Sequence, residues 1–96
     1  MVRKLYLVDY EENGRDKHQA IERMGISCPT DSEIVQMIHF YVGKKNRLSS
    51  VAEFTTDLSL GEFDRVCDMP EILTIPHRVL YVDMEEIERV KEMMNK

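Results

Sequence analysis

The feature that most constrains this fold is an unbroken run of four apolar residues near the N-terminus, Leu5-Tyr6-Leu7-Val8. Successive side chains of a β-strand point to opposite faces of the sheet, so this run presents apolar groups on both sides. Such a strand is stable in water only when both faces are covered, which is typical of a central strand. The sequence therefore predicts a strand over residues 2–9 in the middle of a sheet.

The stretch at residues 34–42 has two interpretations. Thr30 and Glu33 have the spacing of a capping box, which favours a helix over 31–42. The stretch is also rich in Ile, Val, Phe and Tyr and ends at the turn-forming sequence GKKN, which favours a strand. We predict a β-hairpin that pairs 34–42 with 47–56, and the helix over 31–42 is the alternative.

Helix signals mark other segments of the chain. Ser59 and Glu62 form a second capping box, apolar residues follow at helical spacing, and Pro70 ends this helix. An apolar stripe predicts a helix over 15–24, with Gly25 as its C-terminal stop. The remaining predicted elements are a strand over 77–82 and a final helix over 84–95.

The predicted elements follow the order βαββαβ, with a helix added at the C-terminus. That order is typical of the ferredoxin-like α+β fold, in which an antiparallel sheet carries two helices on one face. Right-handed crossovers place the strands at 2–9 and 47–56 in the middle of the sheet. A chain of 96 residues is expected to form a single domain, 1–96.

Segments within residues 3–83 are similar to motifs of the RNA-recognition-motif (RRM) family. Those segments are LYLVDY (5–10), RLSSVAEF (47–54) and IPHRVLYV (75–82). In this resemblance Tyr6 stands at the aromatic position of the first-strand motif. The third-strand motif departs from the family at Ser49 and Val51, where the family carries aromatic rings that stack on bases. The resemblance implies binding of single-stranded RNA with a reduced stacking platform.

Period-2 alternation gathers large side chains on the face of the predicted sheet that points away from its two helices. The anchors of this face are Tyr6, Tyr41, Val51 and Tyr81. A large apolar side chain gains about 1.5–3 kcal/mol on full burial, so a face of this composition requires a cover. The predicted cover is the helix over 84–95, a second copy of the chain or a foreign partner, and the face is a predicted binding surface.

The formal net charge of −5 counts against a protein whose main task is to grip phosphate backbones, because such binding draws on clustered Lys and Arg. Charge can still be local. Lys44, Lys45 and Arg47 form a basic tip at the predicted hairpin turn, which could contact phosphate or an acidic protein.

Acidic residues follow the first strand. Asp9 and Glu12 could hold a divalent cation through their oxygens. The segment YLVDYEEN at 6–13 also looks like the first strand of PIN-like nucleases, which ends in a metal-binding aspartate. The plainer interpretation is a solvated turn, in which Asn13-Gly14 reverses the chain.

Cysteine and histidine positions predict neither a metal site nor a cofactor. Cys28 and Cys67 show no CxxC spacing and are predicted to be reduced, buried thiols, with a single disulfide between them as the alternative. His18, His39 and His77 share no metal-ligand spacing and are predicted to be surface residues. The chain shows no signal peptide and no membrane span, which predicts a cytoplasmic location without membrane contact.

These patterns together favour a small non-enzymatic binding module that acts by protein–protein interaction. An adaptor or a stoichiometric inhibitor of the kind found in mobile elements would have this size and composition. The expected partner is another protein or a second copy of the chain. A degenerate RRM-like binder of single-stranded RNA is the alternative, and a small metal-dependent nuclease that uses Asp9 and Glu12 is the second alternative.

Overall fold

The computed structural model of the chain describes residues 2–23, 29–85, 88 and 91–92. Its centre is a four-stranded antiparallel sheet in the order β2-β1-β3-β4. The strands are β1 (Arg3–Glu12), β2 (Arg15–Glu22), β3 (Arg47–Thr56) and β4 (His77–Val82). The prediction that the first apolar run and the 47–56 segment form the central pair is therefore confirmed.

Helices separate the later strands. These are α1 (Asp31–Val42), α2 (Leu60–Val66) and the short 3-10 helix η1 (Pro70–Thr74). The element order is ββαβαβ, counting η1 with α2. The chain is thus an α+β protein with an antiparallel sheet, as predicted, but the ferredoxin-like order βαββαβ is not observed.

The predicted helix over 15–24 is wrong, because residues Arg15–Glu22 form the edge strand β2. The cause is the turn between β1 and β2, where Asn13 and Gly14 both have positive φ, 54° and 77°. Two residues with positive φ make the tight hairpin turn that matches the twist of paired strands. This turn pairs Glu12 with Arg15 and directs the following chain along β1. Gly25, the predicted stop of the helix, lies outside the described residues.

The predicted hairpin of 34–42 with 47–56 is also wrong, and the alternative helix over 31–42 is confirmed as α1. The Thr30 hydroxyl accepts a hydrogen bond from the backbone N–H of Glu33 at 3.2 Å, which starts the helix. Gly43 ends it with a φ of 106°, a conformation that favours glycine. The local caps therefore prevail over the β-branched composition of this stretch.

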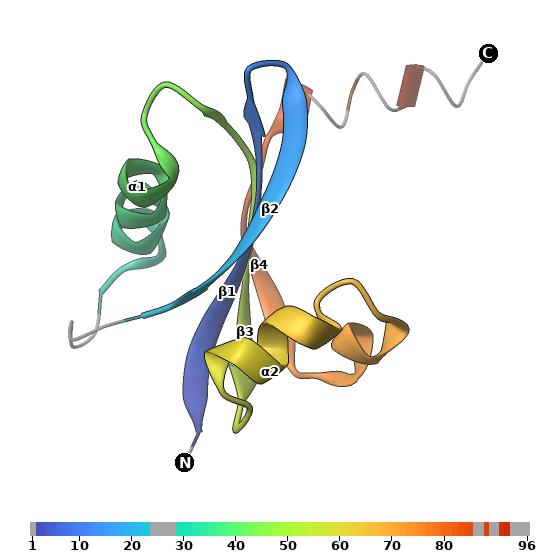
Figure 1. The fold of residues 1–96 in the computed structure, drawn as a ribbon. Coiled ribbons are helices and arrows are strands. Elements are labelled where there is room, and N and C mark those ends of the chain that lie inside the picture. The colour runs from blue at the N-terminus through green and yellow to red at the C-terminus, as the bar shows by residue number, and fades with distance from the viewer. Residues whose placement is uncertain (1, 24–28, 86–87, 89–90, 93–96) are drawn as a thin grey trace.

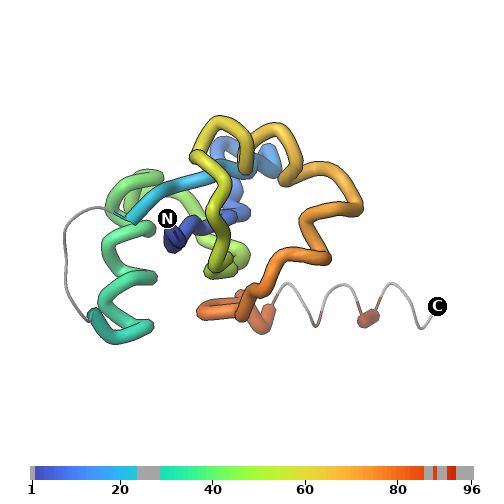
Figure 2. The backbone as a smooth tube through the Cα atoms, turned by 90° about the horizontal axis from the view of Figure 1, so that it is seen from below, coloured from blue at the N-terminus to red at the C-terminus, as the bar shows by residue number. Residues whose placement is uncertain are grey.

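The two helices lie on opposite sides of the sheet, as Figure 1 shows in side view and Figure 2 shows from below. Tyr6 and Val8 of β1 pack with Ile34 and Ile38 of α1. Leu5 and its neighbours on the other face pack with α2 and η1. Both faces of β1 are thus covered, which is what its apolar run requires. The predicted arrangement with both helices on one face is not observed.

The core beneath α2 is centred on an aromatic pair. The rings of Phe54 in β3 and Phe63 in α2 meet edge to face, with centroids 5.1 Å apart and planes at 61°. The predicted capping box at the start of α2 is confirmed, because the Ser59 hydroxyl accepts from the Glu62 N–H and the Glu62 carboxylate accepts from the Ser59 N–H. Cys67, at the end of α2, completes this cluster.

The chain beyond β4 begins as predicted for a final helix. The Asp83 carboxylate accepts a hydrogen bond from the backbone N–H of Glu85 at 3.0 Å. Met84 and Glu85 are helical and exposed. Much of the predicted helix over 84–95 lies outside the described residues.

Candidate functional site

The predicted binding face is largely covered by α1. Tyr6 is 1 % exposed and Val51 is fully buried, so neither can stack on a base or contact a partner in this structure. Tyr81 is half-buried against the same cluster. Tyr41 lies on α1 instead of the sheet and is 65 % exposed, at a pocket that Tyr6 also lines. This face is covered by α1, which is the segment that we predicted to be a strand of the sheet.

A buried carboxylate organises the polar part of this interface. Glu53 of β3 is 5 % exposed and accepts hydrogen bonds from the Tyr6 hydroxyl at 2.9 Å and from Arg78 Nε at 3.0 Å. The Arg78 guanidinium also makes two 2.9 Å hydrogen bonds to the Asp31 carboxylate in the first turn of α1. Arg78 therefore ties the start of α1 to the sheet, and this network is structural.

The network shifts the pKa values of two of its members. Burial, and then the adjacent Glu53 carboxylate, raise the pKa of Tyr6 from 10.0 to about 12. Burial alone would raise the pKa of Glu53. The hydrogen bonds from Tyr6 and Arg78, together with the nearby positive charges, outweigh burial and hold the pKa below 4.5.

We expect Glu53→Gln to lower the free energy of unfolding by about 1–2 kcal/mol at neutral pH, because the ion pair with Arg78 and the charged acceptor of the Tyr6 hydrogen bond are lost. The folded pKa of Glu53 is lowered, so its contribution is present above pH 4.5 and is lost as the pH falls through the folded value. Urea unfolding of both proteins from pH 7 down to pH 3 measures this. A difference that stays constant over that range would contradict the assignment.

Exposed apolar side chains of α1 lie next to its buried ones. The core-facing side of α1 buries Ile34 and Ile38. Met37, Phe40 and Tyr41 are exposed, and Phe40 is 71 % exposed. The spacing i, i+3, i+4 places these three on one face of the helix. Met37 and Tyr41 also line one pocket with the buried Ile34 and Ile38, so this exposed apolar surface adjoins the core-facing side of α1.

Charged groups stand at both ends of this stripe. Glu33 lies one turn before Met37 and is exposed. Lys44 follows the stripe in the turn after α1, and its Nζ lies 5.7 Å above the centre of the Phe40 ring. We define the α1 outer surface as the face formed by Glu33, Met37, Phe40, Tyr41 and Lys44. A pocket of about 220 Å³ opens beside it, between α1 and β2, and includes Met37 and Tyr41.

The predicted basic tip is only partly assembled. Lys44 and Lys45 are exposed in the turn between α1 and β3. Arg47 instead pairs with acidic residues that follow β4, in a 2.7 Å ion pair with Asp83 and a 3.2 Å ion pair with Glu85. The hydrogen bond to Asp83 raises the pKa of the Arg47 guanidinium. The tip therefore consists of two lysines, and they lie next to the exposed aromatic rings of α1.

Asp9 and Glu12 are not brought together. β1 pairs regularly with β2, so residues three apart on β1 face opposite sides of the sheet. The Asp9 carboxylate accepts a hydrogen bond from the Ser50 hydroxyl at 3.0 Å. The Glu12 carboxylate lies 3.1 Å from Lys17 Nζ and accepts from Asn46 at 3.2 Å. This arrangement does not form the metal site that the nuclease alternative needs.

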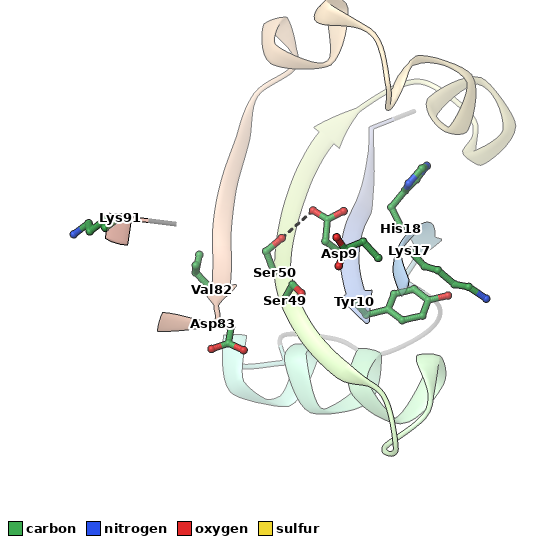
Figure 3. A pocket seen from close by; sticks show the side chains of 10 residues that line it. Asp9, Tyr10, Lys17, His18, Ser49, Ser50, Val82, Asp83 and Lys91 are labelled. Atoms are coloured by element: carbon green, nitrogen blue, oxygen red, sulfur yellow. Dashed lines mark hydrogen bonds between the residues drawn. The ribbon is translucent and has the colours of Figure 1, made fainter. Parts of the chain in front are cut away.

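A pocket of about 520 Å³ lies on the α2 side of the sheet, at the end that α2 does not cover (Figure 3). Its floor is polar. Asp9 and Ser50 are joined across β1 and β3, and His18 stands beside them on β2. Val82 and Asp83 of the β4 end line the opposite wall.

Next to this pocket, three ligand-type side chains converge. Among the described residues, His18, Cys67 and Asp68 bring one imidazole nitrogen, the thiol sulfur and one carboxylate oxygen within 4.8 Å of one another. His18 and Asp68 are exposed, whereas Cys67 is buried. Burial raises the pKa of the Cys67 thiol, and the Asp68 and Asp64 carboxylates raise it further.

Sequence reasoning missed this cluster. His18 was predicted to be a surface or edge-strand residue and not a ligand, and it is indeed exposed on the edge strand β2. His18 is far from Cys67 in the chain, and only the contact of α2 with β2 brings them together. No spacing in the sequence indicates that these three side chains meet. The adjacent pair Cys67-Asp68 was visible, but it has no diagnostic value by itself. Cys28 lies outside the described residues.

The described residues form no helix with the length and apolar character needed to cross a membrane. Comparison with protein-family models, with curated proteins and with solved structures finds no match to this chain. The resemblance to the RRM family therefore stays a prediction, and any function must be argued from the geometry.

Proposed function

We propose that this chain is a non-enzymatic protein-binding module that docks through the α1 outer surface, and that its partner is a second copy of the chain. The observation that supports this most is the exposure of two adjacent aromatic side chains, Phe40 at 71 % and Tyr41 at 65 %, on one helix. Large aromatic side chains supply much of the binding energy of protein interfaces.

The helix is well suited to this role because its position is already fixed. Ile34 and Ile38 anchor it in the core, and the hydrogen bonds between Arg78 and Asp31 hold its first turn. A surface on a rigid element loses little conformational freedom on binding, so more of the contact energy appears as affinity.

The order of charges along the α1 outer surface favours a second copy. Glu33 stands at the start of the stripe and Lys44 at its end, with the apolar side chains between them. A two-fold axis across an antiparallel pair of α1 helices places Lys44 of each copy near Glu33 of the other. This arrangement is isologous and complementary in charge.

Sedimentation velocity of the full chain over a range of concentrations tests the proposal. We expect a concentration-dependent dimer in the wild type. Phe40→Ala/Tyr41→Ala should raise the dimer dissociation constant about thirtyfold, as expected for the loss of hot-spot side chains. Met69→Ala/Leu73→Ala is the matched control, because it removes two exposed apolar side chains elsewhere on the surface.

A charge exchange tests the antiparallel geometry. Glu33→Lys and Lys44→Glu should each weaken the dimer, because each places like charges opposite one another. The double variant should restore it. A wild type that stays monomeric at high concentration, or a dimer that is unaffected by Phe40→Ala/Tyr41→Ala, would contradict the proposal.

The second candidate function is binding of single-stranded RNA. The contact of Lys44 with the Phe40 ring favours it. Exposed aromatic rings beside lysines are the parts from which sequence-tolerant RNA surfaces are built. Fluorescence anisotropy with an RNA oligonucleotide at low and high salt tests it. Salt-sensitive binding that is lost in Lys44→Gln/Lys45→Gln supports it, and the absence of binding at low salt excludes it.

A further inference from the structure

The side chains of His18, Cys67 and Asp68 converge on the side of the sheet opposite to α1. His18 belongs to β2, whereas Cys67 and Asp68 follow α2. His18 Nε2 lies 3.4 Å from Asp68 Oδ1, and the three ligand atoms all lie within 4.8 Å of one another. We propose that these residues bind a single zinc ion.

The distances suit a metal of this kind. Zinc ligands lie at about 2.0–2.3 Å from the ion, so neighbouring ligand atoms of a tetrahedral site are about 3.3–3.7 Å apart. The pair His18 Nε2 and Asp68 Oδ1 already has such a separation. The distances to the Cys67 sulfur can shorten by movement of the His18 and Asp68 side chains. Both are exposed, so they can move without disturbing the core.

The donor set selects the class of metal. A thiolate sulfur and an imidazole nitrogen favour zinc and similar transition-metal ions over calcium and magnesium, which prefer oxygen ligands. Three protein ligands leave a fourth position, and the exposed sides of His18 and Asp68 open it to solvent. The Cys67 thiol, which now donates to the Asp64 carbonyl oxygen at 3.0 Å, releases its proton to solvent when its sulfur binds the ion.

The surroundings favour a cation. Asp9 lies opposite His18 in the pairing of β1 with β2, on the same face of the sheet. The Ser50 hydroxyl donates a hydrogen bond to the Asp9 carboxylate, as Figure 3 shows. Carboxylates next to metal-binding histidines orient the ring and add negative charge. The ion would tie the edge strand β2 to the end of α2.

The test uses the full, untagged chain in its reduced and metal-free form. Calorimetric titration with Zn²⁺ should show one ion per chain, and titration with Co²⁺ should give a thiolate-to-cobalt charge-transfer band. His18→Ala and Asp68→Asn should each weaken zinc binding by about tenfold or more. Cys67→Ala should remove the charge-transfer band, while Cys28→Ser should retain it.

Matched controls are His77→Ala and Asp57→Asn, which remove a histidine and an aspartate outside the cluster and should leave zinc binding unchanged. His18 and Asp68 are exposed, so their variants are expected to fold even if Cys67→Ala does not. An absence of zinc binding by the wild type at submillimolar concentration would overturn the proposal. Binding that is equal in the wild type, His18→Ala and Asp68→Asn would overturn it as well, whatever the oligomeric state.

Discussion

Replacing Phe63 with alanine is expected to lower the free energy of unfolding by about 3–5 kcal/mol, the range found for large-to-small substitutions of buried aromatic residues. Phe63 is fully buried and makes the edge-to-face contact with Phe54. It is also the buried residue of α2, a helix of seven residues that is too short to be stable without its packing. The substitution should therefore detach α2 from the sheet as well as leave a cavity.

Urea unfolding followed by circular dichroism measures this loss. Leu73→Ala is the control, because Leu73 is 73 % exposed and its truncation should change stability by less than about 0.5 kcal/mol. A small domain has only about 5–15 kcal/mol of stability, so Phe63→Ala is expected to remove a large share of it. A loss of less than about 1 kcal/mol would show that α2 does not contribute to the core as described.

Replacing Tyr6 with phenylalanine is expected to change the alkaline limit of the fold. The folded pKa of Tyr6 is raised from 10.0 to about 12, so the neutral hydroxyl is favoured in the folded state. Its contribution is fully present below pH 10 and is lost as the pH rises from 10 to 12. The linkage corresponds to about 2–3 kcal/mol, since one pKa unit is worth 1.36 kcal/mol. Tyr6→Phe lacks this titration.

The measurement is the free energy of unfolding of both proteins at intervals from pH 7 to pH 12. Near neutral pH the wild type should be more stable, because its hydroxyl donates to the Glu53 carboxylate. That advantage should shrink through the window from pH 10 to 12, while titrations common to both proteins cancel. Tyr41→Phe, at an exposed position, should keep the pH dependence of the wild type. A constant difference between wild type and Tyr6→Phe would contradict the assignment.

Elements with strong local signals could be predicted from the sequence. The apolar run of β1 indicated a central strand, and β1 is central because only that position covers both of its faces. The capping box at Ser59 started α2, and the strand at 77–82 has the predicted bounds. In each case one local feature admits a single arrangement of the backbone.

The segments at 15–24 and 34–42 were assigned the wrong way round because their local signals conflict. β2 is an edge strand whose first half is exposed and whose second half is only partly buried, so it lacks the apolar content of a typical strand. α1 is rich in β-branched and aromatic residues because its apolar surface extends from the buried Ile34 and Ile38 to exposed side chains such as Phe40. An apolar stripe at helical spacing favoured the wrong assignment at 15–24, and β-forming composition did so at 34–42, whereas the Asn13-Gly14 turn and the Thr30 cap indicated the right ones.

The candidate sites depended more strongly on the tertiary structure. Tyr41 was predicted as a contact residue and is exposed, but Phe40 beside it becomes part of a surface only once the segment is a helix. Tyr6 and Val51, predicted as anchors of the same face, are buried by α1. The His18, Cys67 and Asp68 cluster exists only because α2 packs against β2.

The amino-acid sequence by itself determined that the central strand is apolar on both faces and that an apolar face of the sheet needs a cover. It also determined where the helices begin, through their caps. The tertiary structure alone decided which segment provides that cover and which side chains meet. The reason is physical: caps, turns and alternation act between neighbours in the chain. Covering a face and gathering ligands depend on packing between distant segments, whose energies no local pattern records.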